Sequence, residues 1–231
     1  MRDLTRYRVD LIGVRTAEKN RVEKLLEDAQ IKLSVVASDI FGVSGRAMLA
    51  ALVAGERDPK VLAQLARQRL RAKLSLLEEA FYGRFSDHHG FLLQTMLDRI
   101  DQTSAAIATL EAKIEQQIVP FQAAVVRLDE ICGVGRAAAQ VLIAEIGVDM
   151  GRFPTPGHLV SWARFAPGVK ESAGKKKGKA STGRGNPYLA RVLGEAAVAA
   201  GRTNTFWASA TGASRGAAAP SGPWSRSAAR S

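Results

Sequence analysis

Apolar residues recur at helical spacing along the first third of the chain. Between Arg2 and Ala29 they are Leu11, Val14, Val22, Leu25 and Leu26, separated by charged residues. Such spacing places the apolar side chains on one face of a helix, with charges such as Glu18 and Arg21 on the solvated face. Gly42, Gly45, Gly55 and Pro59 then punctuate the chain into short helices. Ser44 is the expected N-cap of a helix over residues 46–54.

Two longer helical patterns follow. The first covers residues 59–83, with Leu62, Leu65, Leu70, Leu74, Leu77 and Phe81 on one side. The second covers residues 91–118, where one side of the helix is formed at steps of four and three by Leu93, Leu97, Ile100, Ser104, Ile107, Leu110 and Ile114. This spacing predicts a coiled coil or long helical hairpin. Residues 87–90 form the bend between the helices. The pair His88 and His89 suggests a metal, but a polar corner is favoured because no further His or Cys lies nearby.

Pro120 ends the second pattern, since proline interrupts helices. Residues 125–202 then predict a separate small helical domain. From Ala208 to Ser231 the composition falls to mainly Ala, Gly, Ser, Pro and Arg without apolar periodicity, which is typical of disorder. The expected fold is mainly α. Its parts are linker helices over 1–58, a coiled-coil hairpin over 59–120, a C-terminal domain over 125–205 and a disordered tail over 206–231.

The charge balance points to a polyanionic partner. The formal net charge is +11, from 33 Lys and Arg against 22 Asp and Glu. This favours nucleic acid first and an anionic membrane surface second. No stretch approaches the roughly 20 apolar residues of a membrane-spanning helix. Cys132 is the only cysteine, which excludes an internal disulfide, and we expect it to be a small packed residue. A cytoplasmic, nucleoid-associated protein fits these features.

A Gly-Val-Gly turn separates two helical segments over residues 128–146. Gly133 and Gly135 allow a tight turn and a close approach to phosphate. The amides that open the next helix then face the anion, and Arg136 adds a charge. This pattern resembles a helix-hairpin-helix, which grips the DNA backbone without reading sequence. The alternative is an ordinary tight turn between packed helices.

A basic, glycine-rich stretch runs from Arg164 to Arg202. Its lysines are Lys170, Lys175, Lys176, Lys177 and Lys179. With Arg184 and Arg191, they are candidates for contacts with a phosphate backbone, which would weaken steeply with salt. Asn186 and Pro187 predict the start of a final helix to about Ala200, with Leu189, Val192 and Leu193 packed inward. Trp162 and Phe165 offer stacking surfaces for bases, although core packing beside Leu159 is the favoured interpretation.

Ser172 lies just before these lysines. A serine hydroxyl becomes a nucleophile only when a base or a strong positive field activates it. Neighbouring Lys and Arg would stabilise charge that develops on a phosphodiester. From chemistry alone, the ordinary interpretation of Ser172 is a solvated loop residue.

Several motifs together resemble one transposase family. They are residues 131–135 (Ile-Cys-Gly-Val-Gly), 144–147 (Ala-Glu-Ile-Gly), 152–154 (Arg-Phe-Pro), 158–159 (His-Leu), 166–168 (Ala-Pro-Gly), Ser172 with the following lysines, and 185–189 (Gly-Asn-Pro-Tyr-Leu). Their order and spacing resemble the C-terminal domain of the transposases of insertion sequences 110, 116 and 902. The segments 15–21 and 41–45 resemble the part that links the family's two conserved domains.

The resemblance implies site-specific DNA recombination, with Ser172 as the nucleophile that forms a covalent link to DNA. It also implies a structured guide RNA as a partner and an RNase-H-like domain whose four acidic residues hold a divalent metal such as Mg²⁺. We further expect a homo-oligomer. We expect that domain to precede Met1, because Asp10, Glu18 and Asp28 do not fill its places. We therefore expect a decayed or truncated gene product, with no metal site or cofactor of its own and no autonomous catalysis.

The chain departs from the family in two further places. The family has Ser-Gly where this chain has Ser172, Ala173 and Gly174, and the tail after Thr205 lacks the family's further helices. Two alternatives to a transposase remain open. One is a non-catalytic nucleic-acid-binding module, and the other is a helical protein that oligomerises through residues 59–118.

Overall fold

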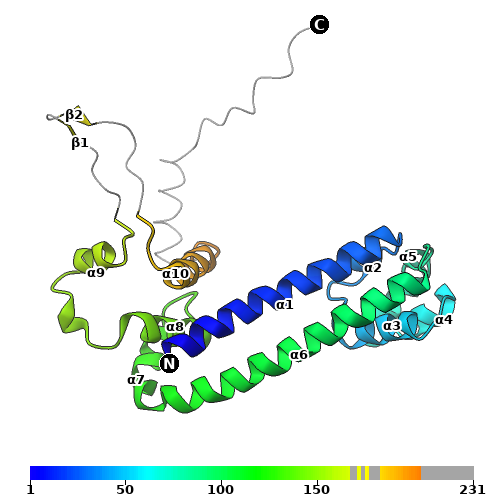
Figure 1. Cartoon of the computed structure of the whole chain (residues 1–231), viewed down its shortest axis with the longest axis horizontal. Helices are drawn as coiled ribbons and strands as arrows, with labels where there is room; N and C mark the ends of the chain where they lie inside the picture. Colours follow the sequence, from blue (N-terminus) through cyan, green and yellow to red (C-terminus); the bar gives the residue numbers. More distant parts are fainter. Residues whose placement is uncertain (167–170, 173–174, 177–182, 204–231) are drawn as a thin grey trace, which may run out of the picture. The chain divides into compact units, whose positions relative to one another are not determined.

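The computed structural model describes residues 1–166, 171–172, 175–176 and 183–203. Helices dominate this part of the chain (Figure 1). The predicted disordered tail, Lys170, Lys177 and Lys179 lie outside the described residues. The chain forms two compact units: unit 1 comprises Met1–Arg6 and Lys113–Ser231, and unit 2 comprises Tyr7–Ala112. No helix among the described residues is long and apolar enough to cross a membrane.

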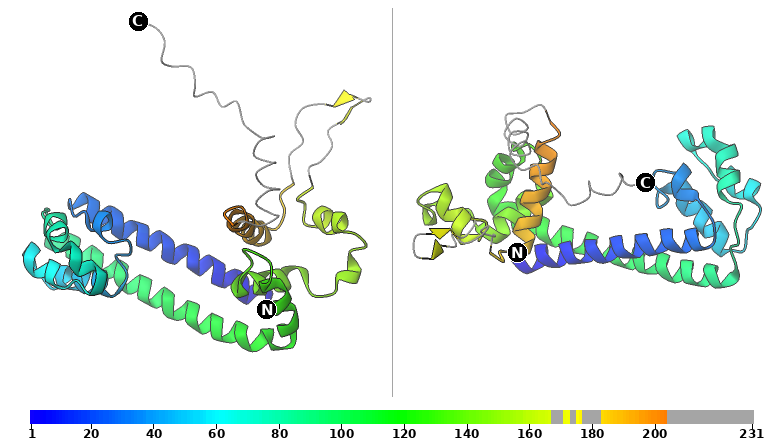
Figure 2. Two further views of the ribbon diagram at one scale, coloured as in Figure 1. Left: turned by 180° about the vertical axis from the view of Figure 1, so that it is seen from behind. Right: turned by 90° about the horizontal axis from the view of Figure 1, so that it is seen from above.

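Unit 2 is organised around two long helices and a set of short ones. Its elements are α1 (Arg2–Asp28, which begins in unit 1), α2 (Leu33–Val36), α3 (Val43–Val53), α4 (Pro59–Gln64), the 3₁₀ helix η1 (Gln68–Lys73), α5 (Leu74–Ala80) and α6 (Asp87–Ile118, which ends in unit 1). Figures 1 and 2 show α1 and α6 running side by side in opposite directions. Within unit 2, Arg99 and Glu18 join them through an ion pair of 3.1 Å.

One apolar core holds unit 2 together. Its fully buried members include Val22, Leu33, Met48, Leu49, Leu77 and Leu93. The predicted helices over residues 2–29 and 91–118 are present, because their apolar faces pack on this core. Pro120 follows the end of α6, as expected, in the 3₁₀ turn η2 (Val119–Phe121).

The predicted single helix over residues 59–83 is wrong. It is divided into α4, η1 and α5, so its leucines reach the core from three short helices. Arg67 is extended, with φ −120° and ψ 156°, and Gln68 has a left-handed φ of 49°, so the helix cannot continue. Consequently α1, and not residues 59–83, runs alongside α6.

Two smaller predictions in unit 2 are also wrong. Residues 87–90 are the first turn of α6, and the bend lies before them, where Ser86 N–H donates to His89 Nδ1 over 3.1 Å. Gly42, and not Ser44, is the N-cap of α3. The Ser44 hydroxyl instead accepts a hydrogen bond from the Arg67 amide at 3.0 Å, because the chain brings Arg67 back to this helix.

Unit 1 contains the C-terminal helices. They are α7 (Gln122–Asp129), α8 (Arg136–Ile146), the 3₁₀ helix η3 (Met150–Arg152), α9 (Pro156–Trp162) and α10 (Pro187–Ala200), with two-residue strands β1 (Glu171–Ser172) and β2 (Lys175–Lys176). The strands are antiparallel, and Ser172 is in register with Lys175. As predicted, Asn186 begins α10: its Oδ1 accepts from the amides of Tyr188 and Leu189. Leu189 and Val192 are buried, but Leu193 is 39% exposed and borders an apolar cavity of about 410 Å³.

Candidate nucleic-acid interface

The Gly-Val-Gly turn joins α7 to α8, as the sequence predicts. Gly133 has φ 87°, which L side chains rarely adopt, and a Cβ there would lie 2.5 Å from the carbonyl oxygen of Ala196 in α10. Gly133 is therefore required both for the turn and for the packing of α10 against it. Gly135 is the N-cap of α8, and a Cβ on it would meet open space. Cys132 is half-buried, with Sγ 3.1 Å from Oγ1 of Thr203.

Arg136, the expected phosphate contact of this turn, is already engaged within unit 1. Its Nε donates to Glu115 Oε1 at 2.9 Å, and a second nitrogen donates to Gln122 at 3.3 Å. The hydrogen bond and charge of Glu115 raise the pKa of Arg136 above its ordinary value. A phosphate at the turn would have to compete with this carboxylate. Arg191 is similarly paired, with Nε 2.9 Å from Glu195 Oε1 one turn further along α10.

A buried carboxylate organises the other motifs of unit 1. Glu145, on α8, is 2% exposed. Arg6 holds it through two hydrogen bonds of 2.7 and 2.8 Å, and Asn186 Nδ2 donates to it at 2.6 Å. Arg2 lies 3.6 Å from Oε2 of Glu145 and donates to the backbone carbonyls of Ala144 and Glu145. We name Glu145, Arg2, Arg6 and Asn186 the Glu145 cluster.

Opposing effects set the pKa of Glu145. Burial raises it, because a carboxylate loses hydration. Hydrogen bonds from Arg6 and Asn186, with the charges of Arg6 and Arg2, outweigh that effect and leave the pKa below its usual range. Glu145 is therefore ionised, and its charge is balanced by the arginines of α1. Arg6 also lies over the ring of Tyr188, 5.2 Å from its centroid. The Glu145 cluster thus links α1, α8 and the start of α10.

Arg164 and Arg184 stand at the two ends of the segment that carries β1 and β2. Arg164 follows α9, and Arg184 precedes α10 (Figure 1). Their side chains are exposed, and neither guanidinium has a hydrogen bond or an ion pair among the described residues. The ends are close together: a Cβ on Gly183 would lie 3.4 Å from the Arg164 side chain, and one on Gly185 would lie 2.3 Å from the carbonyl oxygen of Ala163.

The backbone at Arg164 is unusual. Arg164 has φ 59°, in the left-handed region. It closes α9 in a Schellman motif, in which Phe165 N–H donates to Val160 and Arg164 N–H donates to Ser161. Glycine or asparagine normally occupies this position. An arginine there has a conformational cost of about 1 kcal/mol relative to glycine.

A pocket of about 230 Å³ lies between these ends and the Glu145 cluster. Its lining is Arg2, Arg6, Glu145, Trp162, Ala163, Arg164, Arg184, Gly185 and Asn186. Four arginines thus face one carboxylate, and the pair at Arg164 and Arg184 is not neutralised by any described group. Such a pocket attracts an anion. We name it the arginine pocket.

Trp162 differs from the prediction of core packing. It is 46% exposed, borders the arginine pocket, and contacts Phe153 edge to face at a centroid distance of 5.5 Å. Phe165 is half-buried beside Gly185.

The arginines predicted to bind nucleic acid differ in their partners. Arg136 and Arg191 form ion pairs, whereas Arg184 has no partner among the described residues. Among the described residues, no three His, Cys, Asp or Glu side chains gather as metal ligands.

Sequence reasoning singled out Arg184 and missed the Glu145 cluster. The signal for it was a carboxylate within the apolar run of residues 141–146, which needs a buried partner. The partners Arg2 and Arg6 lie in a distant helix, and no pattern in the sequence connects them to Glu145.

The comparisons with known proteins bear on this region. Neither the curated proteins nor the solved structures give a match. Residues 125–211 match the sequence model of the Transposase IS116/IS110/IS902 family. The matched range contains the glycine turn, Glu145, Ser172 and the arginines at 164 and 184. The match supports a role in DNA transposition and is consistent with residues 125–211 being the C-terminal portion of a transposase of that family.

Proposed function

We propose that this chain is the DNA-binding, serine-bearing part of a site-specific transposase. The observation that carries the proposal is the arginine pocket, where Arg164 and Arg184 have no partner among the described residues. Both guanidinium groups bind phosphate oxygens through forked donors. The chain then holds the phosphodiester backbone at the two ends of the segment that contains Ser172. Arg2 and Arg6 add positive potential, although Glu145 offsets part of it.

In the proposed reaction, the Ser172 oxygen attacks a DNA phosphorus atom. A serine–phosphate ester forms, the bond from phosphorus to a deoxyribose oxygen breaks, and that oxygen leaves with the proton that the serine hydroxyl loses. The arginines stabilise the charge that develops on the phosphate oxygens. A metal held by an acidic RNase-H-like domain is part of the family's chemistry. The described residues do not offer a ligand set for it, so no step here is assigned to a metal.

DNA binding is tested with two double variants of equal charge loss. Arg164→Gln with Arg184→Gln removes the unpaired cations, whereas Arg136→Gln with Arg191→Gln removes cations that Glu115 and Glu195 already neutralise. We expect the first pair to weaken duplex binding at least tenfold and to lower the salt slope by about 2, since each phosphate contact contributes about 0.9. The second pair should change both quantities less. Equal losses would reject the arginine pocket as the binding site.

The nucleophile is tested in a transposase that joins this chain to an acidic domain of the family. We expect Ser172→Ala to abolish the covalent protein–DNA adduct and strand transfer while leaving DNA binding unchanged. Ser181→Ala is the matched control in the same basic stretch of the sequence. Unchanged strand transfer in Ser172→Ala would reject Ser172 as the nucleophile and would leave the second candidate, a non-catalytic nucleic-acid-binding module, which the unpaired arginines favour equally. A guide RNA and a homo-oligomer belong to the same proposal.

A further inference from the structure

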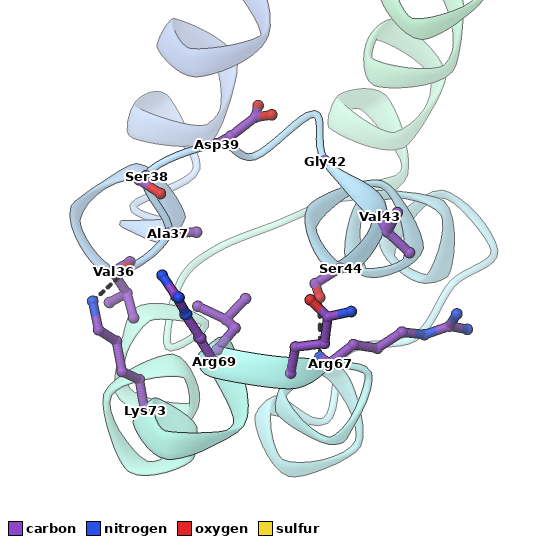
Figure 3. Close-up of a pocket in the computed structure, with 12 residues that line it drawn as sticks. Val36, Ala37, Ser38, Asp39, Gly42, Val43, Ser44, Arg67, Arg69 and Lys73 are labelled. Atoms are coloured by element: carbon purple, nitrogen blue, oxygen red, sulfur yellow. Dashed lines mark hydrogen bonds between the residues drawn. The ribbon is translucent and has the colours of Figure 1, made fainter.

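Unit 2 contains a pocket of about 630 Å³ that lies outside the family domain. It is bounded by the segment that follows α2, the start of α3, and η1 (Figure 3). Its lining is Val36, Ala37, Ser38, Asp39, Gly42, Val43, Ser44, Arg67, Gln68, Arg69, Leu70 and Lys73. We name it the η1 pocket. Three of these residues are cations, and one is an acid.

The cations have spare hydrogen-bond donors. The guanidinium groups of Arg67 and Arg69 have no partner among the described residues. Lys73 Nζ donates to the Val36 carbonyl at 3.1 Å, which leaves two of its three donors. In Figure 3, Arg69 and Lys73 both reach from η1 toward the segment that begins at Val36. Their positive charges therefore meet at one side of the pocket.

The acid does not neutralise them. Asp39 Oδ1 accepts a hydrogen bond from the Phe41 amide at 2.9 Å. Its carboxylate points away from the pocket in Figure 3. The remaining polar groups are hydroxyls: Ser44, whose oxygen accepts from the Arg67 amide, keeps its own proton to donate, and Ser38 has no described partner. The pocket thus offers an excess of donors and positive charge, which suits an anion rich in acceptor oxygens.

The sequence concentrates charge at this place. Residues 67, 69, 71 and 73 are all basic, and no acidic residue occurs between Asp58 and Glu78. The left-handed Gln68 and the bond from Arg67 to Ser44 start η1 against α3. A structural role alone does not require basic residues at alternate positions of an exposed 3₁₀ helix.

We propose that the η1 pocket binds the phosphodiester backbone of a nucleic acid, as a second contact outside residues 125–211. The volume exceeds what one phosphate needs, and the guanidinium and hydroxyl groups match phosphate oxygens. The choice of nucleic acid among polyanions rests on the proposed function of the chain.

The test uses the full chain and a matched pair of variants. Arg69→Gln removes a cation that lines the pocket, and Arg71→Gln removes the same charge two residues away on η1, outside the lining. The probes are a DNA duplex and an RNA hairpin with equal numbers of phosphates, titrated over a range of salt. We expect Arg69→Gln to weaken binding several-fold and to lower the duplex salt slope by about 0.9. Arg71→Gln should have a clearly smaller effect. The probe that shows the larger loss identifies DNA or RNA as the ligand.

A second pair of variants adds a negative charge and removes no positive one. Ser38→Glu places a carboxylate in the lining, and Ser34→Glu places one on the exposed side of α2. Only Ser38→Glu should weaken binding, while circular dichroism confirms that both variants fold. Equal losses within either pair would mean diffuse attraction and would overturn the proposal, as would no loss at all.

The outcome is separable from that of the arginine pocket. If the two surfaces are independent, the free-energy losses of Arg69→Gln and of the Arg164 and Arg184 double variant should add. A loss in the double variant alone would retain the proposed function and reject the η1 pocket. A loss in Arg69→Gln alone would retain the η1 pocket and reject the arginine pocket.

Discussion

Among the described residues, each unit buries one glutamate, and the two are held differently. Glu18 in unit 2 and Glu145 in unit 1 are both 2% exposed. Glu18 is paired with Arg21 and Arg99, whose side chains are 58% and 60% exposed, through a single carboxylate oxygen. Glu145 is held by both oxygens, with Arg6 and Asn186 as donors. The first pairing reinforces two helices that already share an apolar core, whereas the second ties the first turns of α1 to α8 and to the start of α10 through a buried carboxylate.

The largest expected effect separates the two carboxylates. Arg6→Ala should lower the free energy of unfolding of unit 1 by about 3 kcal/mol, because a buried carboxylate loses its main partner. Arg99→Ala should cost unit 2 less than about 1 kcal/mol, because Arg99 is largely exposed and Arg21 remains. Trp162, Trp207 and Trp224 all follow Lys113, so tryptophan fluorescence during urea unfolding reports on unit 1, and circular dichroism reports on both units. Equal losses of unfolding free energy in the two variants would show that Glu145 and Glu18 do not differ in their dependence on one arginine.

A smaller effect tests how the glycine turn supports unit 1. Gly133→Ala should cost about 2 kcal/mol, because it combines a left-handed φ with a clash against α10. Gly135→Ala should cost less, about 1 kcal/mol, because its backbone is extended and the added carbon meets open space, so that only the preference for glycine over alanine at an N-cap is lost. Urea unfolding followed by tryptophan fluorescence measures both variants. A similar cost for the two would show that packing of α10 on the turn contributes nothing.

The smallest effect is a pH dependence of unit 1. The pKa of Glu145 in the folded chain lies below its ordinary value, so ionised Glu145 stabilises the fold above the unfolded pKa of about 4.3. That contribution should decrease as the pH falls below about 4, where the unfolded state binds the proton first. Urea unfolding at a series of acidic pH values measures it, and Glu145→Gln should flatten the dependence. If the unfolding free energy of the wild type depended on pH as little as that of Glu145→Gln, the predicted contribution of Glu145 would be contradicted.

Regular helices were predictable from the sequence, and interrupted ones were not. The helices α1, α6 and α10 follow apolar periodicity and the punctuation by Pro120 and Asn186. The segment of residues 59–83 has the same periodicity, but the left-handed Gln68 breaks it. A glutamine carries no signal for that conformation. The apolar periodicity therefore predicted which side chains are buried in the core. It did not predict whether one helix or three short helices carry them.

The candidate site was predictable from the sequence only where residue types, or partners close in the sequence, determine it. The glycine turn and the basic segment are evident from residue types, and Arg184 has no partner in the part of the chain that the structure describes. Arg136 and Arg191 have the same residue type but are neutralised by Glu115 and Glu195. Glu195 lies one helical turn from Arg191, so the ion pair between them could have been predicted from the sequence. The pairing of Arg136 depends on how α6 continues past Lys113, which the sequence pattern does not specify.

The Glu145 cluster also has a topological consequence. Arg2 and Arg6 precede Tyr7–Ala112 in the chain, whereas Glu145 and Asn186 follow it. Unit 1 is thus discontinuous in sequence, and unit 2 is inserted between its two segments, Met1–Arg6 and Lys113–Ser231. A fragment that starts at Lys113 would retain the buried carboxylate but lose both arginines. A separate peptide bearing Arg2 and Arg6 would then be the missing part, so the domain is suited to fragment complementation.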